Sequence, residues 1–584
     1  MKNVSQKLFH YPPAQKTDVV DDYHGTPIAD PYRWLEDPAS AETQAWVAAQ
    51  NELTESYLSE LSVRAELKER LTKLWDYPKY NASHKKESGY FFQFNDGLKN
   101  QPVLCRQTTL DDEPTVVLDP NTLSEDGTLA LTMYAVSKNG RFLAYNLSQS
   151  GSDWQHIRIL DMETNETFDE TIQWCKFTPT AWTDDNAGFF YARYPSPDDM
   201  SDAPPSSHHR VFYHKLGTPQ SDDQLVYARP DAPDLGFQPY MTEDSRFLTL
   251  HVWEGTDRRN RFYYKDLESD GEFVRLLDDL DAGYNCIGSD DTVFYFQTDF
   301  EAENGRVIAI DLTKPARDNW QELIPEQNDA IAFSLMVNNQ FVIARLHNAH
   351  HWLFVYNLDG TLDREIELPT AGTIFEMGGK RKHTEMFILF LSFLYPPTVL
   401  RFDFATGTLH THQQPQLDFD PSQYETTQVL YPSKDDTNIP LFLTYKKGLK
   451  LDGSNPTLLY GYGGFNINMT PLFSPTRLAW IEKGGIYAHA CLRGGSEFGE
   501  AWHQAGMLAN KQNVFDDFIA AGEWLIANNY TRKGRLAIEG RSNGGLLVAA
   551  CMTQRPDLFG AVHCGVQVID MFRYHKFTAG RYWT

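Results

Sequence analysis

The residues best suited to chemistry form the stretch Gly540-Arg541-Ser542-Asn543-Gly544, which fits the pattern Gly-x-Ser-x-Gly. The apolar run Leu536–Ile538 precedes it and the apolar run Leu546–Ala550 follows it, which predicts a strand, a tight turn and a helix. Such a turn lifts a serine hydroxyl above the helix N-terminus, where the helix dipole favours a developing negative charge. The two glycines of the pattern leave room for the turn, and Gly545 lets the helix pack closely. Ser542 is therefore predicted to be the nucleophile of an acyl transfer; the alternative is a serine that only caps an ordinary helix.

An oxyanion needs hydrogen-bond donors, and two places in the sequence offer them. One is the backbone N–H of Asn543, the residue after the nucleophile. The other is the glycine-rich segment Tyr460-Gly461-Tyr462-Gly463-Gly464-Phe465, which follows a predicted strand. Either Tyr460 or Tyr462 could donate from its phenol, and a glycine loop with packed aromatic side chains is the alternative.

The serine also needs a general base, and in this strand-turn-helix fold an Asp and then a His follow the Ser along the chain. The residues after Ser542 include two Asp and two His that could be considered, namely Asp557, His563, Asp570 and His575. One lies in a turn after the nucleophile helix, one inside a predicted strand, and two are only five residues apart. We expect all four to be structural and the catalytic Asp and His to lie beyond residue 584. The chain is then C-terminally truncated and inactive alone, or it is not a working hydrolase.

The elements around Ser542 alternate between strand and helix, which predicts a parallel-rich sheet with helices on both faces. The expected strands are residues 439–445, 457–460, 486–491, 535–539 and 561–566, and the expected helices are residues 514–528, capped by Asn513, and 544–553. We expect this incomplete domain to span residues 426–584.

Residues 76–425 carry short β-type runs that recur at a nearly constant spacing. The central residues of these runs are Phe91, Phe142, Phe189, Phe247, Val293, Phe341 and Phe387, so the spacings are 51, 47, 58, 46, 48 and 46 residues. A period near 50 residues is the size of one four-stranded propeller blade. Seven copies predict a seven-bladed β-propeller, and a pair of β-sandwiches is the alternative. Residues 1–75 are predicted to be helical, over 41–61 and 63–74.

The composition limits the protein's class. Hydrophobic residues make up 41% of the chain and charged residues 22%, which is ordinary for a globular protein. A net charge of −27 argues against nucleic acid and anionic membrane as partners. The six cysteines are scattered and predicted to be free and buried, and no leader or membrane-spanning run is apparent, so we expect a cytoplasmic protein. The pairs His208-His209 and His350-His351 are expected in loops, and neither a metal nor a cofactor is expected.

Longer motifs resemble the prolyl oligopeptidase family along essentially the whole chain. The motifs are Asp22-Tyr23-His24-Gly25, Asp30–Asp37, Gly151-Ser152-Asp153-Trp154, Tyr460–Phe465, Leu508–Asn513 and Ser542–Ala549. The resemblance implies an α/β-hydrolase domain joined to a seven-bladed β-propeller, with the N-terminal helices packing on the hydrolase domain. It also implies a serine endopeptidase that cleaves short peptides on the carboxyl side of proline, and a monomer when intact.

Position by position, the resemblance makes Ser542 the nucleophile and makes the Tyr462 hydroxyl and the Asn543 N–H the oxyanion hole. The substrate-binding residues that it implies are Phe465, Val568 and Trp583 in a proline pocket, with Phe177 on the propeller side. An indole that stacks on a proline ring and excludes water is chemically sensible. Two alternatives stay open: a peptide-binding pseudo-hydrolase that no longer cleaves, and an oligopeptidase with basic-residue specificity, against which the apolar pocket argues.

Overall fold

The computed structural model describes residues 9–196, 206–577 and 580–583, and the chain divides into two compact units, 1–73 and 74–584. The first unit contains the hairpin β1 (Val20–Tyr23) and β2 (Thr26–Ala29), followed by α1 (Ala41–Ser59) and all but the last two residues of α2 (Val63–Trp75). Both helices lie where the apolar spacing predicts them. The predicted domain boundaries stay predictions.

The second unit begins with seven antiparallel sheets, each built from consecutive strands. The first four sheets are β3 (Lys79–Tyr80), β4 (His84–Lys86), β5 (Gly89–Asn95), β6 (Val103–Gln107) and β7 (Thr115–Leu118); β8 (Leu129–Val136), β9 (Phe142–Gln149), β10 (Gln155–Asp161), β11 (Glu166–Thr167) and β12 (Ile172–Cys175); β13 (Ala181–Trp182), β14 (Gly188–Arg193), β15 (Arg210–Lys215) and β16 (Gln224–Ala228); and β17 (Leu235–Met241), β18 (Phe247–Glu254), β19 (Arg261–Asp266) and β20 (Val274–Leu277). The last three are β21 (Tyr284–Asp290), β22 (Val293–Thr298), β23 (Arg306–Asp311) and β24 (Gln321–Ile324); β25 (Ala330–Val337), β26 (Gln340–His347), β27 (His350–Asn357) and β28 (Leu362–Ile366); and β29 (Thr373–Gly378), β30 (Glu385–Leu391), β31 (Thr398–Asp403) and β32 (Thr408–Gln413).

These sheets are the seven blades of a propeller, and the recurring runs all fall on the second strand of a blade: β5, β9, β14, β18, β22, β26 and β30. A second strand has a hydrogen-bonded neighbour on each side and packs against the adjoining blades, so it buries large apolar side chains. Phe189 and Phe341, for example, are both fully buried. The seven-bladed propeller predicted from the period is therefore confirmed.

Adjacent blades are joined by buried histidines as well as by apolar packing. His209 Nδ1 accepts the N–H of Phe237 at 3.0 Å, and His351 Nδ1 accepts the N–H of Ile374 at 2.9 Å. Burial lowers the pKa of both imidazoles, that of His351 to about 4, so each stays neutral and can accept. The prediction that His350 and His351 lie in a loop is wrong, because they open strand β27.

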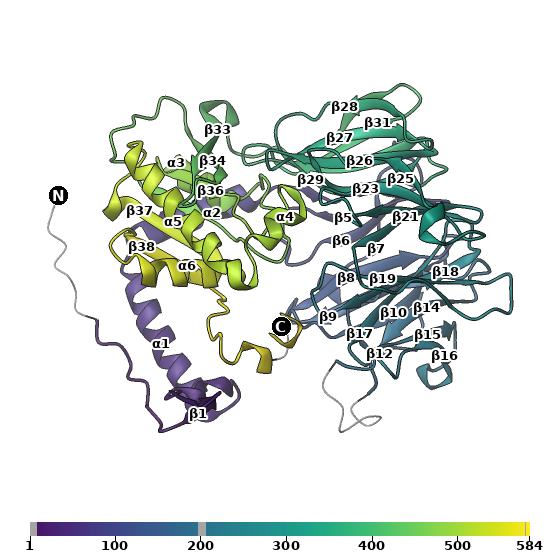
Figure 1. Ribbon diagram of the computed structural model, residues 1–584, viewed down its shortest axis with the longest axis horizontal. Coiled ribbons are helices and arrows are strands. Elements are labelled where there is room, and N and C mark those ends of the chain that lie inside the picture. The colour runs from purple at the N-terminus through teal and green to yellow at the C-terminus, as the bar shows by residue number, and fades with distance from the viewer. Residues whose placement is uncertain (1–8, 197–205, 578–579, 584) are drawn as a thin grey trace. The chain divides into compact units, whose positions relative to one another are not determined.

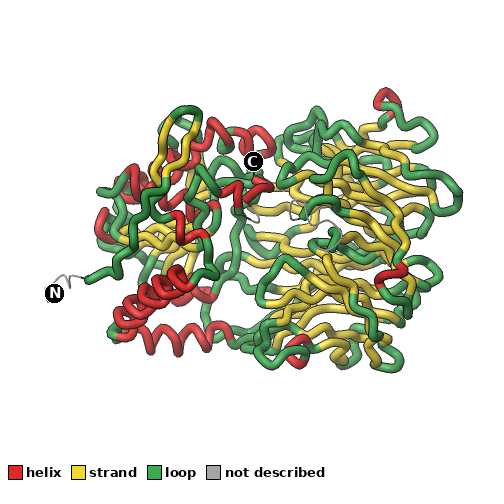
Figure 2. Tube along the Cα trace, turned by 90° about the horizontal axis from the view of Figure 1, so that it is seen from below, coloured by secondary structure: helices red, strands yellow, loops and turns green. Residues whose placement is uncertain are grey.

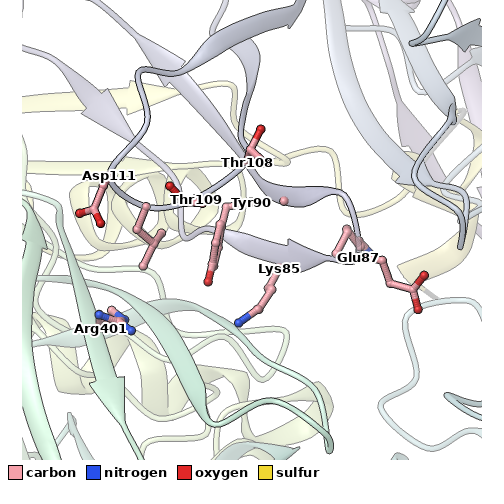
Figure 3. Close-up of a pocket in the computed structure, with 10 residues that line it drawn as sticks. Lys85, Glu87, Tyr90, Thr108, Thr109, Asp111 and Arg401 are labelled. Carbon is pink, nitrogen blue, oxygen red and sulfur yellow. The ribbon is translucent and has the colours of Figure 1, made fainter.

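The first and last blades meet without a shared strand in the described residues, so side chains close the ring. Glu385 on β30 accepts from Lys85 Nζ and from the Tyr90 hydroxyl, each at 2.6 Å, and from Arg401 Nε at 2.7 Å. Burial alone would raise the pKa of this carboxyl, but these three donors hold it at about 2. A cavity of about 340 Å³ opens beside the seam, with Lys85, Tyr90 and Arg401 on its wall (Figure 3).

The second part of this unit is a six-stranded sheet in the order β33-β34-β36-β35-β37-β38. Its strands are β33 (Tyr424–Pro432), β34 (Asn438–Lys446), β35 (Thr457–Tyr460), β36 (Ile486–Ala490), β37 (Leu536–Arg541) and β38 (Ala561–Gly565). The last four strands of this order are parallel, and β33 and β34 are antiparallel. The predicted parallel-rich sheet is present, with an antiparallel edge that the sequence did not indicate.

Helices cover both faces of this sheet, as predicted (Figure 1). They are α3 (Pro475–Glu482), α4 (Gly499–Gln504), α5 (Lys511–Ala527) and α6 (Asn543–Gln554). On one face, α5 and α6 share a core with the strands, and on the other, Arg477 of α3 lies over the rings of Tyr460 and Tyr487. The predicted cap Asn513 is wrong, because α5 begins earlier and Asn513 Nδ2 donates to the Ala505 carbonyl at 2.9 Å.

The region of recurring strands and the region of alternating strands and helices, both predicted from the sequence, occupy separate parts of the chain in the structure. The described residues between 79 and 413 form strands, turns and three short 3-10 helices but no α-helix, whereas α3 to α6 all lie between 475 and 554. Figure 2 shows the strand-rich part in yellow, with only short red segments in it. No helix of the described residues is long and apolar enough to cross a membrane. All six cysteines are free; Cys286 and Cys564 are half-buried, which corrects the prediction that every thiol is buried.

Candidate active site

Ser542 lies at the turn between β37 and α6, with a strained backbone of φ 55° and ψ −119°. Close backbone packing surrounds it. A Cβ on Gly540 would lie 2.0 Å from the Gly544 carbonyl oxygen, and a Cβ on Gly544 would lie 2.8 Å from the Gly461 oxygen. A Cβ on Gly545 would lie 2.8 Å from Gln567 Cα. The three glycines singled out in the sequence are therefore positions where only glycine fits, and together they confine the strained turn.

Tyr462 is the tyrosine that reaches the serine. Its phenol shares a side-chain hydrogen bond with Ser542. Burial raises the pKa of this phenol, while the hydrogen bond to Ser542 lowers it, and the net direction is upward. Tyr460 instead faces the opposite side, where its ring lies under Arg477 and 5.5 Å from the His489 ring. Of the two candidates left open by the sequence, the structure therefore brings only Tyr462 to Ser542.

Asn543 connects the elbow to the glycine-rich segment. It is the first residue of α6, so its N–H has no partner within the helix. Its side chain donates from Nδ2 to the Tyr462 carbonyl at 2.7 Å. Lys511 lies in the motif Leu508–Asn513, to which the sequence analysis gave no role. It donates from Nζ to the Gly463 carbonyl at 2.6 Å and to Asn543 Oδ1 at 3.1 Å.

Aromatic side chains that the resemblance assigns to a proline pocket lie together. The ring centres of Phe465 and Trp583 are 5.9 Å apart with an interplanar angle of 68°, and Tyr574 stacks on Trp583 at 6.4 Å. Phe465 is 39% exposed, so an apolar face remains open to a ligand. Val568 is half-buried in the connection that follows β38. Tyr574 was not foreseen, because its place is set by this tertiary stacking.

Phe177 lies apart from these groups, in the connection between the second and third blades. It is 46% exposed, has a backbone φ of 49°, and accepts a hydrogen bond from Gln238 at its carbonyl, at 3.0 Å. Close by, the Lys176 ammonium lies 4.2 Å from the centre of the Trp154 ring. The structure thus leaves aromatic side chains exposed on the propeller, but in the part of the chain that it describes no contact joins Phe177 to Ser542.

Two of the four Asp and His residues considered after Ser542 have ion-pair partners elsewhere. Asp557 pairs with Arg555 at 2.9 Å and Lys533 at 2.8 Å. His563 lies 3.5 Å from a Glu539 oxygen, on a strand face. Within the described ranges, none of the four has a hydrogen bond to Ser542, and the expectation that all four are structural stays a prediction.

The loop that leads from β36 into α4 meets the propeller. Glu500 at the start of α4 donates its N–H to the Glu303 carbonyl at 3.1 Å, and its carboxylate pairs with Arg258 at 2.5 Å. Arg258 also pairs with Asp299 of the next blade. These contacts fix the hydrolase-like domain to the rim formed by the fourth and fifth blades.

Comparisons with known proteins agree with this architecture. Residues 11–415 match the family model described as "Prolyl oligopeptidase, N-terminal beta-propeller domain", and residues 471–584 match "Prolyl oligopeptidase family". The chain is 40% identical over 580 residues to the prolyl endopeptidase of Elizabethkingia meningoseptica, covering 99% of this chain and 82% of that protein. It is 34% identical over 619 residues to prolyl oligopeptidase A of Amanita bisporigera, covering 98% and 81%.

Solved structures of prolyl oligopeptidases are also similar to the structure of this chain. One comes from a study of two prolyl endopeptidases and of inter-domain dynamics in catalysis and specificity; it has a TM-score of 0.94 at 36% identity, covering 98% of this chain and 85% of that one. Another is prolyl oligopeptidase B from Galerina marginata bound to a 25mer macrocyclization substrate, with a TM-score of 0.93 at 32% identity, covering 98% and 84%. The family resemblance read from the motifs is therefore confirmed: this chain belongs to the prolyl oligopeptidase family of serine peptidases.

Proposed function

We propose that this protein is an endopeptidase that cleaves short peptides on the carboxyl side of proline through an acyl-enzyme on Ser542. The observation that carries the proposal is the strained elbow, where Ser542 meets the phenol of Tyr462 beside the free N–H of Asn543. Acyl transfer requires a nucleophile, donors for the oxyanion and a general base, and the elbow supplies the first two of these.

The proposed reaction begins when Ser542 Oγ forms a bond to the carbonyl carbon of the proline residue, while its proton passes to a general base. The carbonyl oxygen becomes an oxyanion that accepts from the Tyr462 phenol and the Asn543 N–H. Because the pKa of Tyr462 is raised, its phenol stays protonated at neutral pH and can donate. The carbon–nitrogen bond then breaks as the proton passes to the leaving amine, and water hydrolyses the ester. Among the described residues, no histidine has a hydrogen bond to Ser542, so the base is left unassigned.

Proline selectivity is proposed to come from the aromatic group of Phe465 and Trp583, with Val568 beside it and Phe177 binding the peptide from the propeller. A proline ring has an apolar face and no N–H, so it suits a flat aromatic wall that excludes water. No metal or cofactor is required for this chemistry. We also propose a monomer located in the cytoplasm, which sedimentation and cell fractionation would test.

The test uses the protein purified from its native source and three blocked dipeptide amides that differ only in Pro, Ala or Arg at the cleaved position. We expect rapid hydrolysis of the Pro amide alone, and a loss of about 1,000-fold or more in Ser542→Ala. Equal rates on the Arg amide would favour basic-residue specificity instead. Unchanged activity in Ser542→Ala would refute the assignment of the nucleophile.

A further inference from the structure

Lys511 is a cation in an unfavourable place. It is the first residue of α5, so it lies at the positive end of the helix dipole, and it is partly buried. Its ammonium pairs with no carboxylate among the described residues, and its two hydrogen bonds there go to neutral oxygens. Burial lowers the pKa of Lys511 to about 8. A cation that loses hydration without gaining a counter-ion lowers stability, which points to another role for it.

The two hydrogen bonds of Lys511 link segments that lie far apart in the sequence. One reaches Gly463, the residue after Tyr462, and the other reaches the side chain of Asn543, the residue after Ser542. Asn543 completes the connection by donating to the Tyr462 carbonyl. The glycine-rich segment and the elbow are also in close contact, since a Cβ on Gly464 would lie 2.6 Å from Asn543 Nδ2. Lys511 thus ties together the two residues that carry the proposed oxyanion donors.

We propose that Lys511 is a positioning residue of the oxyanion hole. It holds the Tyr462 phenol and the Asn543 N–H in fixed positions relative to each other and keeps a positive charge beside them. The inference rests on the proposed function, because it assigns Lys511 a part in stabilising the oxyanion formed on Ser542. Lys511 acts through its two neighbours and does not itself touch the substrate.

The charge of Lys511 makes its proposed role depend on pH, which would not be so if Lys511 only held the two segments together. Burial is the sole cause of the lowered pKa of Lys511, and no charged group on the elbow, the glycine-rich segment or α5 contributes to it. The other titratable side chain of the network is Tyr462, whose pKa is raised above its usual value of 10. As pH rises through about 8, Lys511 loses its proton while Tyr462 keeps its own. Stabilisation of the oxyanion should therefore weaken first on the alkaline side.

The experiment compares the purified protein with Lys511→Met, Lys511→Arg and the control Gln512→Met. Gln512 is the next residue of α5 and is exposed, with its amide bonded to Asp516 and Gln554. The measurements are kcat and KM on the blocked Pro amide, thermal unfolding, and affinity for two matched peptides. One ends in proline aldehyde, which forms a tetrahedral oxyanion with the serine, and the other ends in prolinol, which cannot.

We expect Lys511→Met to lower kcat and aldehyde affinity by about 10- to 100-fold, with KM and prolinol affinity unchanged, because only the charged adduct uses the hole. Lys511→Arg should recover part of the loss. The unmodified protein should lose kcat as pH rises past about 8, and Lys511→Met should lack this decline.

Equal losses of aldehyde and prolinol affinity, or a kcat within about threefold of the control, would overturn the proposal. If Lys511→Met does not fold, the absence of an alkaline decline in the unmodified protein would overturn it as well. Failure of the proposed function is recognised separately, because the unmodified protein would then not hydrolyse the Pro amide, or Ser542→Ala would retain the activity, whatever Lys511→Met does.

Discussion

Gly540 offers a sharp test of how the elbow positions its serine. In Gly540→Ala the new Cβ would lie 2.0 Å from the Gly544 oxygen and 2.5 Å from its carbonyl carbon, both backbone atoms. Real Cβ atoms do not approach other atoms closer than 3.0 Å, so the strand and the helix must separate by at least 1.0 Å, the difference between 3.0 and 2.0 Å. A displacement of this size at a nucleophile costs about 100-fold in rate, and forcing an extra methyl into packed backbone costs about 1–3 kcal/mol.

The matched control is Gly534→Ala, just before the same strand, where an added Cβ would meet nothing within 4 Å. The assay is kcat/KM on the blocked Pro amide, with the free energy of unfolding measured in urea. We expect Gly534→Ala to behave like the unmodified protein and Gly540→Ala to lose about 100-fold in kcat/KM. A loss of less than about threefold in Gly540→Ala, relative to the control, would refute the claim that close backbone contact sets the position of Ser542.

Three further outcomes follow from the structure. Tyr462→Phe should lower kcat by about 100-fold with little change in KM, because the phenol is used only when the oxyanion forms; an altered KM alone would contradict this. Glu385→Gln should lower the free energy of unfolding by about 3 kcal/mol in a urea titration, since Lys85 and Arg401 lose a buried partner. Because the pKa of Glu385 is depressed from 4.5 to about 2, the stability it confers is complete above 4.5 and is lost as pH falls toward 2; Glu385→Gln should lack that acid-sensitive step. The 584-residue chain expressed alone should not hydrolyse the Pro amide, because no described histidine contacts Ser542; rapid turnover that Ser542→Ala abolishes would prove this wrong.

The propeller was predictable from the sequence because buried apolar residues recur at a regular spacing along the chain. Each second strand is buried on both faces, so aromatic and apolar residues recur at the same place in every blade, as at Phe91 and Phe247. The short helices α3 and α4 were not predicted, since eight and six residues carry too few turns for a visible apolar stripe. The cap of α5 was misplaced for a related reason: Asn513 suits a cap, but tertiary contact directs its side chain to Ala505.

The candidate site also contains some residues that the sequence identifies and others that it does not. Ser542 and its glycines form one continuous segment, so their chemistry is visible in the order of the residues. The choice between Tyr460 and Tyr462 depends on which phenol points across the sheet edge toward the serine, and a flexible glycine-rich segment leaves that undetermined until packing fixes it. The role of Lys511 is even harder to predict from the sequence, because its hydrogen-bond partners lie 48 and 32 residues away along the chain.

Strain at Ser542 explains why these distant contacts are needed. A non-glycine residue with φ near 55° costs about 1–3 kcal/mol and relaxes unless its surroundings hold it. The backbone of Ser542 is held on both sides: its N–H donates to Gly565 of β38 at 3.0 Å, and its carbonyl accepts from Gly545 at 2.9 Å. Lys511 and Asn543 then hold the facing segment against this turn. We therefore expect the sheet edge, the helix start and the partly buried Lys511 to hold the serine in position together, and removing any one of them should reduce catalysis before it unfolds the domain.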